Sequence, residues 1–94
     1  MAVEKAAAEE GALMVSAQVA IYPLRQERLA PAVVAVRDAL SAAGLEPTVG
    51  AMSTTVTGEA AAVFGALEQA FVAAGALGHV VMVVTVSNAC PIRA

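Results

Sequence analysis

Aromatic residues and cysteines are almost absent from this sequence of 94 residues, which has two phenylalanines, one tyrosine, one cysteine and no tryptophan. The single cysteine, Cys90, excludes an intrachain disulfide and a cysteine-based metal cluster, so a reducing, cytoplasmic compartment is expected. With so few rings, the core must be built from aliphatic residues and methionine, which bury less area per residue. We therefore expect one small domain that is only modestly stable as a free monomer.

Charged residues are also scarce, since they make up 14% of the chain and leave a formal net charge of −3. No lysine or arginine cluster is present, so nucleic acid is not an expected partner. The mean hydropathy is +0.78. The longest strongly apolar run, Val80 to Val86, is nevertheless far shorter than the ~20 residues of a bilayer-spanning helix. We therefore predict no membrane span, and attribute the apolar excess to a surface buried by self-association.

The first eleven residues, MAVEKAAAEEG, are mostly alanine and glutamate. They lack the apolar core of a secretory signal. We expect residues 1–11 to form a flexible lead-in and residues 12–94 to form a single domain, because no internal repeat or linker follows.

Four segments are predicted to be strands. Residues 13–22 alternate between two faces with a period of two, and residues 79–87 form a valine-rich run. Two shorter strands are expected at residues 45–51 and at about 53–57. Pro47 cannot donate a hydrogen bond to a neighbouring strand, which predicts that residues 45–51 lie at a sheet edge.

Two stretches show the three- and four-residue spacing of apolar positions that is typical of helices packed on one side. Pro31 is favoured in a first helical turn, and Gly44 suits a left-handed C-terminal stop. Thr57 or Gly58 is expected to cap the second helix, with Glu59 in its first turn. The first stripe consists of Leu29, Val33, Val36 and Leu40. The second consists of Val63, Leu67, Ala70, Phe71 and Ala74, before Gly75 and Gly78.

The order βαββαβ predicts an α+β fold, the ferredoxin-like plait, in which a four-stranded antiparallel sheet carries both helices on one face. Its last strand should lie at an edge. Val80, Met82, Val84 and Val86 form one side of that strand, whereas Val81, Val83 and Thr85 form the other. A strand that is apolar on both sides is normally covered on both. The open face of the sheet is therefore expected to pack against another subunit, and such packing can enclose a pocket.

Residues suited to catalysis are few and far apart. His79 and Cys90 bracket the last strand, which separates them by roughly 26 Å at ~3.3 Å per residue. There is no HxxxH or CxxC spacing and no glycine-rich phosphate loop, so we expect no catalytic residue, metal or cofactor. Acidic residues on the helices are expected to be solvated. Glu59 is a partial exception, because it follows a hydroxyl-rich strand and can offset a ligand's positive charge.

Amides and hydroxyls on the strands are the remaining candidates for a site. Each one alone is explained as a strand former, or as a turn residue in the case of Asn88. If the first and third strands are neighbours, however, Gln18 lies beside the hydroxyls of residues 53–55. A planar amide in an apolar shell matches the donor and acceptor edge of an aminopyrimidine. The set comprises Ser16, Gln18, Tyr22, Ser53, Thr54, Thr55, Ser87 and Asn88.

Three segments, taken in order, resemble the thiamine-binding, YkoF-like family of small bacterial and archaeal proteins. They are VSAQVAIYPL at residues 15–24, GAMST at residues 50–54 with Gly58-Glu59, and VTVSNA at residues 84–89. The resemblance extends over about residues 13–91. It implies a ferredoxin-like ligand-binding domain that forms dimers or tetramers through its sheets. It also implies binding of thiamine or its hydroxymethylpyrimidine part without catalysis.

The residues that match these motifs supply a model of the site. In this model Gln18 and Asn88 hydrogen-bond the aminopyrimidine edge, and Glu59 balances the thiazolium charge. The ring is enclosed by Met52, Tyr22 and Met82, with further contacts from Ser53, Thr54 and Ser87. Some family members carry two such domains in tandem. A pocket that needs two domains must therefore be completed here by a second copy, and the sequence leaves open whether the pocket lies within or between subunits.

Two other functions fit the sequence. The first is a regulatory or scaffolding module, comparable to ACT-type domains, whose oligomer surface is its function. The second is a small cofactor-free enzyme of the dimeric α+β barrel kind. That enzyme needs an ionisable group inside the sheet cavity, for which His79 near the rim is the available candidate.

Overall fold

The computed structural model describes residues 13–89. The predicted lead-in, residues 1–11, and Cys90 lie outside the described residues. In chain order, the elements are β1 (Met14–Pro23), α2 (Ala30–Ala42), β2 (Thr48–Val49), β3 (Thr54–Glu59), α3 (Ala60–Gly75) and β4 (Val80–Ser87).

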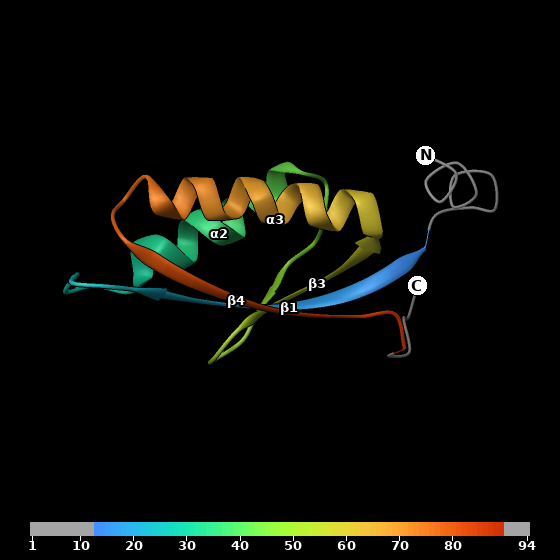
Figure 1. The fold of residues 1–94 in the computed structure, drawn as a ribbon, viewed down its shortest axis with the longest axis horizontal. Helices are drawn as coiled ribbons and strands as arrows, with labels where there is room; N and C mark the ends of the chain where they lie inside the picture. Colours follow the sequence, from blue (N-terminus) through green and yellow to red (C-terminus); the bar gives the residue numbers. More distant parts are fainter. Residues whose placement is uncertain (1–12, 90–94) are drawn as a thin grey trace.

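The four strands form one antiparallel sheet in the order β2-β3-β1-β4. Both helices cover the same face of this sheet, and within residues 13–89 no helix lies on the opposite face (Figure 1). This arrangement confirms the predicted ferredoxin-like plait, including β1 at the centre beside β3 and β4 at an edge. Segments that are distant in the sequence, such as residues 14–19 and 54–59, therefore lie side by side.

The core lies between the sheet and the helices. Alternate residues of β1 and β3 point into it, and the helices contribute one buried stripe each. Most of the buried side of α3 is alanine, so α2 and α3 can pack closely on each other and on the sheet. The buried core consists of Val15, Ala17, Val19, Ala32, Val36, Leu40, Val56, Val63, Ala66, Leu67, Ala70 and Ala74.

The predicted helical stripes are wrong at two positions. Phe71 is 45% exposed, because the buried side of α3 runs through alanines 66, 70 and 74, where a phenylalanine would need far more room. Leu29 is 62% exposed, because it lies just before α2 at the helix cap. Gly44 does adopt the left-handed conformation that was predicted, with a φ of 89°.

The second helix begins later than the sequence predicted. Thr57 and Gly58 continue β3, and Glu59 is the cap of α3 without a side-chain hydrogen bond. The strand extends this far because Glu59 pairs with Met14, and because the Ala60 amide donates to the Leu13 carbonyl at 2.8 Å. The edge position of β2 is confirmed. Its length is reduced to two residues by Pro47 before it and a tight turn after it.

No helix within residues 13–89 is both long enough and apolar enough to cross a lipid bilayer.

Gly65→Ala, in the exposed middle of α3, is expected to raise the free energy of unfolding by about 0.5–1 kcal/mol, since alanine is the better helix former. A methyl group there would meet no atom within 4 Å. Gly78→Ala serves as the contrasting variant, because Gly78 has a φ of 147° and a Cβ would approach Gln26 Nε2 at 2.8 Å. Chemical denaturation should show opposite shifts, and a destabilised Gly65→Ala protein would contradict the described packing of α3.

Candidate ligand-binding site

The face of the sheet opposite the helices, here called the open face, combines apolar and polar side chains. Strand alternation places residues 14, 16, 18, 20 and 22 of β1 on it, between the odd-numbered residues of β3 and β4. Large apolar side chains on this face are solvent-exposed. They are Met14 (42%), Tyr22 (50%), Val81 (45%) and Val83 (51%).

The amide of Gln18 lies near the middle of the open face. Its strand neighbours are Thr55 on β3 and Thr85 on β4. Gln18 Nε2 donates a hydrogen bond to Ser53 Oγ at 3.1 Å, across a sequence separation of 35 residues. A glutamine amide has two N–H donors and one acceptor oxygen. One donor and the acceptor of Gln18 therefore remain available to a ligand.

A hollow of about 190 Å³ surrounds this amide on the open face. Tyr22 and Met52 supply its larger apolar surfaces, and Met52 is 85% exposed. None of the described residues that line the hollow is charged. The lining consists of Gln18, Ala20, Tyr22, Met52, Ser53, Val83 and Thr85.

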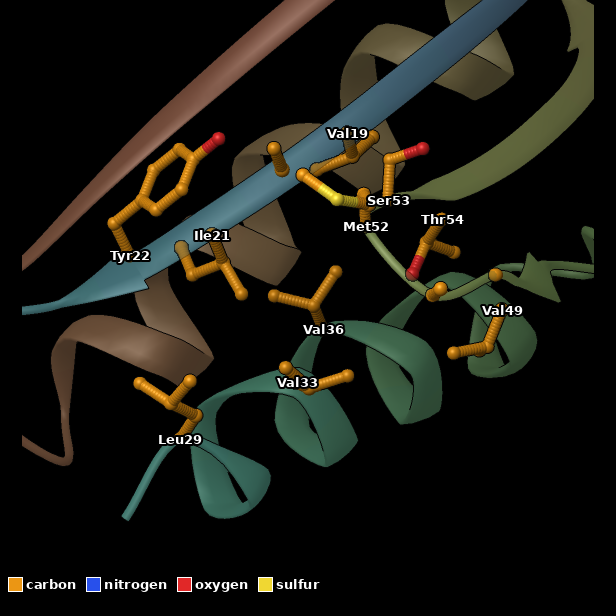
Figure 2. A pocket seen from close by; sticks show the side chains of 13 residues that line it. Val19, Ile21, Tyr22, Leu29, Val33, Val36, Val49, Met52, Ser53 and Thr54 are labelled. Atoms are coloured by element: carbon orange, nitrogen blue, oxygen red, sulfur yellow. The ribbon is translucent and has the colours of Figure 1, made fainter. Parts of the chain in front are cut away.

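A second cavity, of about 290 Å³, lies between α2 and the sheet. Figure 2 shows Val33 and Val36 of α2 facing Val19 and Ile21 of β1. Leu29, which lies just before α2, lines the same cavity. This cavity and the open-face hollow share part of their lining, since Ala20, Tyr22, Met52 and Ser53 border both. The Gly50 amide donates to the Ser53 carbonyl at 2.8 Å, which closes residues 50–53 into a tight turn.

The structure brings together four of the residues singled out in the sequence, Gln18, Tyr22, Met52 and Ser53. Ser87 and Ser16 lie toward the opposite end of the open face. Ser87 pairs with Ser16 and accepts a hydrogen bond from the Ala89 amide at 2.9 Å. Asn88 follows directly after β4 and is exposed.

Glu59 lies four positions along β3 from Thr55, the partner of Gln18. At ~3.3 Å per residue, this spacing places it about 13 Å from the level of the Gln18 amide. Its carboxylate is therefore not part of the hollow.

Thr54 and Met82 lie on the helix side of the sheet. Thr54 is only 4% exposed, and Met82 pairs with Ile21 and packs against the core. Strand alternation is the cause, because residues 54 and 82 have the opposite parity to residues 55, 83 and 85 on the open face. Neither side chain can share the open-face hollow with Gln18.

Ala20, Val83 and Thr85 also line the hollow, although sequence reasoning did not select them. The available signal was cross-strand pairing, since Thr85 lies opposite Gln18 and Val83 lies opposite Ala20. Once β4 is known to pair with β1, the alternation of side chains along β4 places Val83 and Thr85 on the same face of the sheet as Gln18.

Groups suited to catalysis or metal binding are sparse in the described part of the chain. His79 is exposed at the entry to β4. Among residues 13–89, no group of three or more His, Cys, Asp or Glu side chains is arranged to hold a metal ion. The open-face hollow is lined instead by an amide, hydroxyls and apolar surfaces, a mixture that is common in small-molecule pockets.

Comparison with known proteins gives one family and several structural neighbours. A family model described as the YKOF-related family matches residues 14–93. No curated protein matches the sequence. A hypothetical protein from Methanocaldococcus jannascii has 21% sequence identity and a TM-score of 0.73, covering 80% of this chain and 79% of that one.

Two further solved structures have the same fold. A domain of unknown function from Bacillus cereus has 19% identity and a TM-score of 0.70, covering 81% of this chain and 76% of its own. A Thermotoga maritima protein, described provisionally as a thiamine biosynthesis/salvage protein, also has 19% identity and a TM-score of 0.70. It covers 78% of this chain and 81% of its own. Identities this low establish the shared fold alone.

Proposed function

This chain belongs to the YKOF-related family, and we propose on that basis that it binds thiamine or its hydroxymethylpyrimidine moiety without catalysing a reaction. The observation that carries the proposal is the Gln18 amide, oriented by Ser53 within an uncharged hollow on the open face. The provisional description of the Thermotoga maritima protein points to the same class of ligand.

The amide of Gln18 suits the edge of an aminopyrimidine. Its free oxygen accepts a hydrogen bond from the exocyclic amino group, and its free N–H donates to the adjacent ring nitrogen. The hydrogen bond to Ser53 fixes the rotation of the amide, so less side-chain entropy is lost on binding. Tyr22 and Met52 provide the apolar surfaces against which the ring packs.

The volume of the hollow limits how much of the ligand it holds. Ligand pockets usually enclose about 300–1,000 Å³, whereas this hollow encloses about 190 Å³. The pyrimidine ring is therefore the part that the hollow recognises. The thiazolium extends beyond it. None of the described residues that line the hollow carries a carboxylate, so little binding energy is expected from the thiazolium charge.

A second copy of the chain covers the open face in this proposal. Val81 and Val83 are about half exposed on an edge strand, and Tyr22 and Met14 extend the same apolar surface. Among residues 13–89, no charged residue lies on the central part of this face, so two copies can pack sheet to sheet without burying an unpaired charge there. Such packing would close the hollow and form a dimer or tetramer.

The same exposed valines favour a second candidate function, an ACT-like regulatory or scaffolding oligomer. In that case the assembled surface is the function, and thiamine is not a physiological ligand. The two functions differ in one measurable property, because only the first requires the uncharged hollow to bind a pyrimidine.

Isothermal titration calorimetry of the full chain with thiamine and with hydroxymethylpyrimidine tests the proposal. Both ligands are expected to bind, with affinities within about fivefold of each other, because a distant exposed carboxylate contributes at most ~1 kcal/mol. Absence of heat for both ligands up to millimolar concentration would refute thiamine binding and favour the scaffold. Much tighter binding of thiamine would refute recognition through the pyrimidine.

A further inference from the structure

We propose that the cavity between α2 and the sheet, here called the α2 cavity, is a second binding site, which takes a small uncharged aromatic molecule carrying one hydroxyl group. The inference does not depend on thiamine binding, since it rests on the shape, burial and chemistry of this cavity alone. Its volume is about 290 Å³, larger than that of the open-face hollow.

The α2 cavity has a buried floor and an exposed rim. Its floor includes Val19 and Val36, which are 2% and 1% exposed. Its rim includes Leu29, Val49 and Met52, which are 62%, 46% and 85% exposed. A ligand can therefore enter past three apolar side chains and reach the core side of the sheet (Figure 2).

The hydroxyl of Thr54 is the polar group set deepest in this cavity. Thr54 is 4% exposed and is the one buried polar residue among the described residues. None of the side-chain hydrogen bonds within residues 13–89 involves it. Over the same residues, no fully enclosed side-chain oxygen or nitrogen lacks a partner, so the oxygen of Thr54, a residue that lines this cavity, is not fully enclosed.

Figure 2 shows the Thr54 oxygen directed toward the space between the sheet and α2. A hydroxyl in apolar surroundings loses free energy when it has no hydrogen-bond partner. A ligand hydroxyl placed at this depth supplies that partner, because a threonine hydroxyl can both donate and accept. Thr54 therefore sets the position of the polar atom of the ligand.

The rest of the lining determines the class of ligand. None of the described residues that line the α2 cavity is charged, so an ionic group entering it would be desolvated without compensation. Apolar cavities of about 150 Å³ already accept benzene. The α2 cavity is larger, and it holds a single ring with a short hydroxyl-bearing substituent such as benzyl alcohol.

Titration of isotopically labelled full-length protein with benzyl alcohol, followed by amide chemical shifts, tests this site. We expect saturable shifts at residues 33, 36, 49 and 54, and at least tenfold weaker binding of benzylamine and benzoate, which carry a charge. Thr54→Val keeps the shape of the side chain and should weaken benzyl alcohol about three- to tenfold, the factor that one neutral hydrogen bond contributes. Thr55→Val, the same change on the open face of β3, should leave the affinity unchanged.

Val33→Phe, which fills the cavity from α2, should abolish binding, whereas Val34→Phe on the exposed side of the same helix should not. Shifts confined to the open face, equal affinity for the charged probes, or an unaltered affinity in Thr54→Val would each overturn the proposal. Gln18→Leu should leave benzyl alcohol binding intact. Failure of this site is thereby distinguishable from failure of thiamine binding at Gln18.

Discussion

Gln18→Leu should weaken the binding of hydroxymethylpyrimidine by about 10- to 100-fold, the effect of removing a donor and an acceptor that each form a neutral hydrogen bond. Leucine is similar in size and stays on the open face, so the fold should be retained. The ligand's amino group and ring nitrogen would then lie against an apolar side chain. Calorimetry of the variant measures the loss directly.

The matched control for this variant is Gln69→Leu, which makes the same change on the exposed surface of α3. It should bind hydroxymethylpyrimidine with the affinity of the unaltered chain. An unchanged affinity in Gln18→Leu would show that the pyrimidine does not contact this amide. An equal loss in both variants would point to a nonspecific effect of the added apolar surface.

Val81→Asp should convert the assembly into a monomer. Val81 is 45% exposed on the open face and does not line the hollow, so the change addresses association rather than ligand contact. In a sheet-packed dimer, each copy would bury one new carboxylate without a partner, at a cost of several kcal/mol per ion. The dissociation constant should therefore rise by at least 100-fold.

Light scattering coupled to size exclusion measures this effect. The unaltered chain should elute with a mass that is a multiple of 9.4 kDa, and Val81→Asp should elute at 9.4 kDa. Val34→Asp is the control, because Val34 is 40% exposed on the helix side of the molecule. A monomeric unaltered chain, or an assembly that tolerates Val81→Asp, would contradict packing through the open face.

The fold was predictable because its local signals agree with each other. Alternation in residues 13–22, the stripe through Val36 and Leu40, and Gly44 after the first helix each specify one element and its boundary. The order of the elements then restricts the topology to very few arrangements. The strand neighbours follow from that topology, which is why the proximity of Gln18 to residue 53 could be inferred before the structure was known.

Other features depend on tertiary contacts that the sequence does not reveal. The pattern of α3 is apolar on more than one side, so periodicity alone could not tell that Phe71 points outward while the neighbouring alanines are buried. The late start of α3 depends on Glu59 pairing with Met14, a contact 45 residues away along the chain. Local capping preferences favoured an earlier start.

The sequence predicted only some of the residues that line the candidate site. The others could not be predicted because their place depends on the side of the sheet, and on the distance along a strand, at which each side chain lies. Motif matching selected residues near one another in the chain, such as Ser53 and Thr54, yet strand geometry puts their side chains in different environments. Motif matching also gave no measure of distance along a strand. Glu59 shares the open face with Gln18 but lies toward its other end, and Asn88 lies beyond the last residue of β4.

The side-chain amide resonances of the glutamines provide the most direct test of pyrimidine recognition. Gln18, Gln26 and Gln69 each give a distinct pair of N–H signals that single substitutions can assign. On addition of hydroxymethylpyrimidine, the Gln18 pair should shift saturably, while the pairs of Gln26 and Gln69 stay in place. Saturable binding that leaves the Gln18 pair unmoved would contradict the assignment of the open-face hollow as the pyrimidine site.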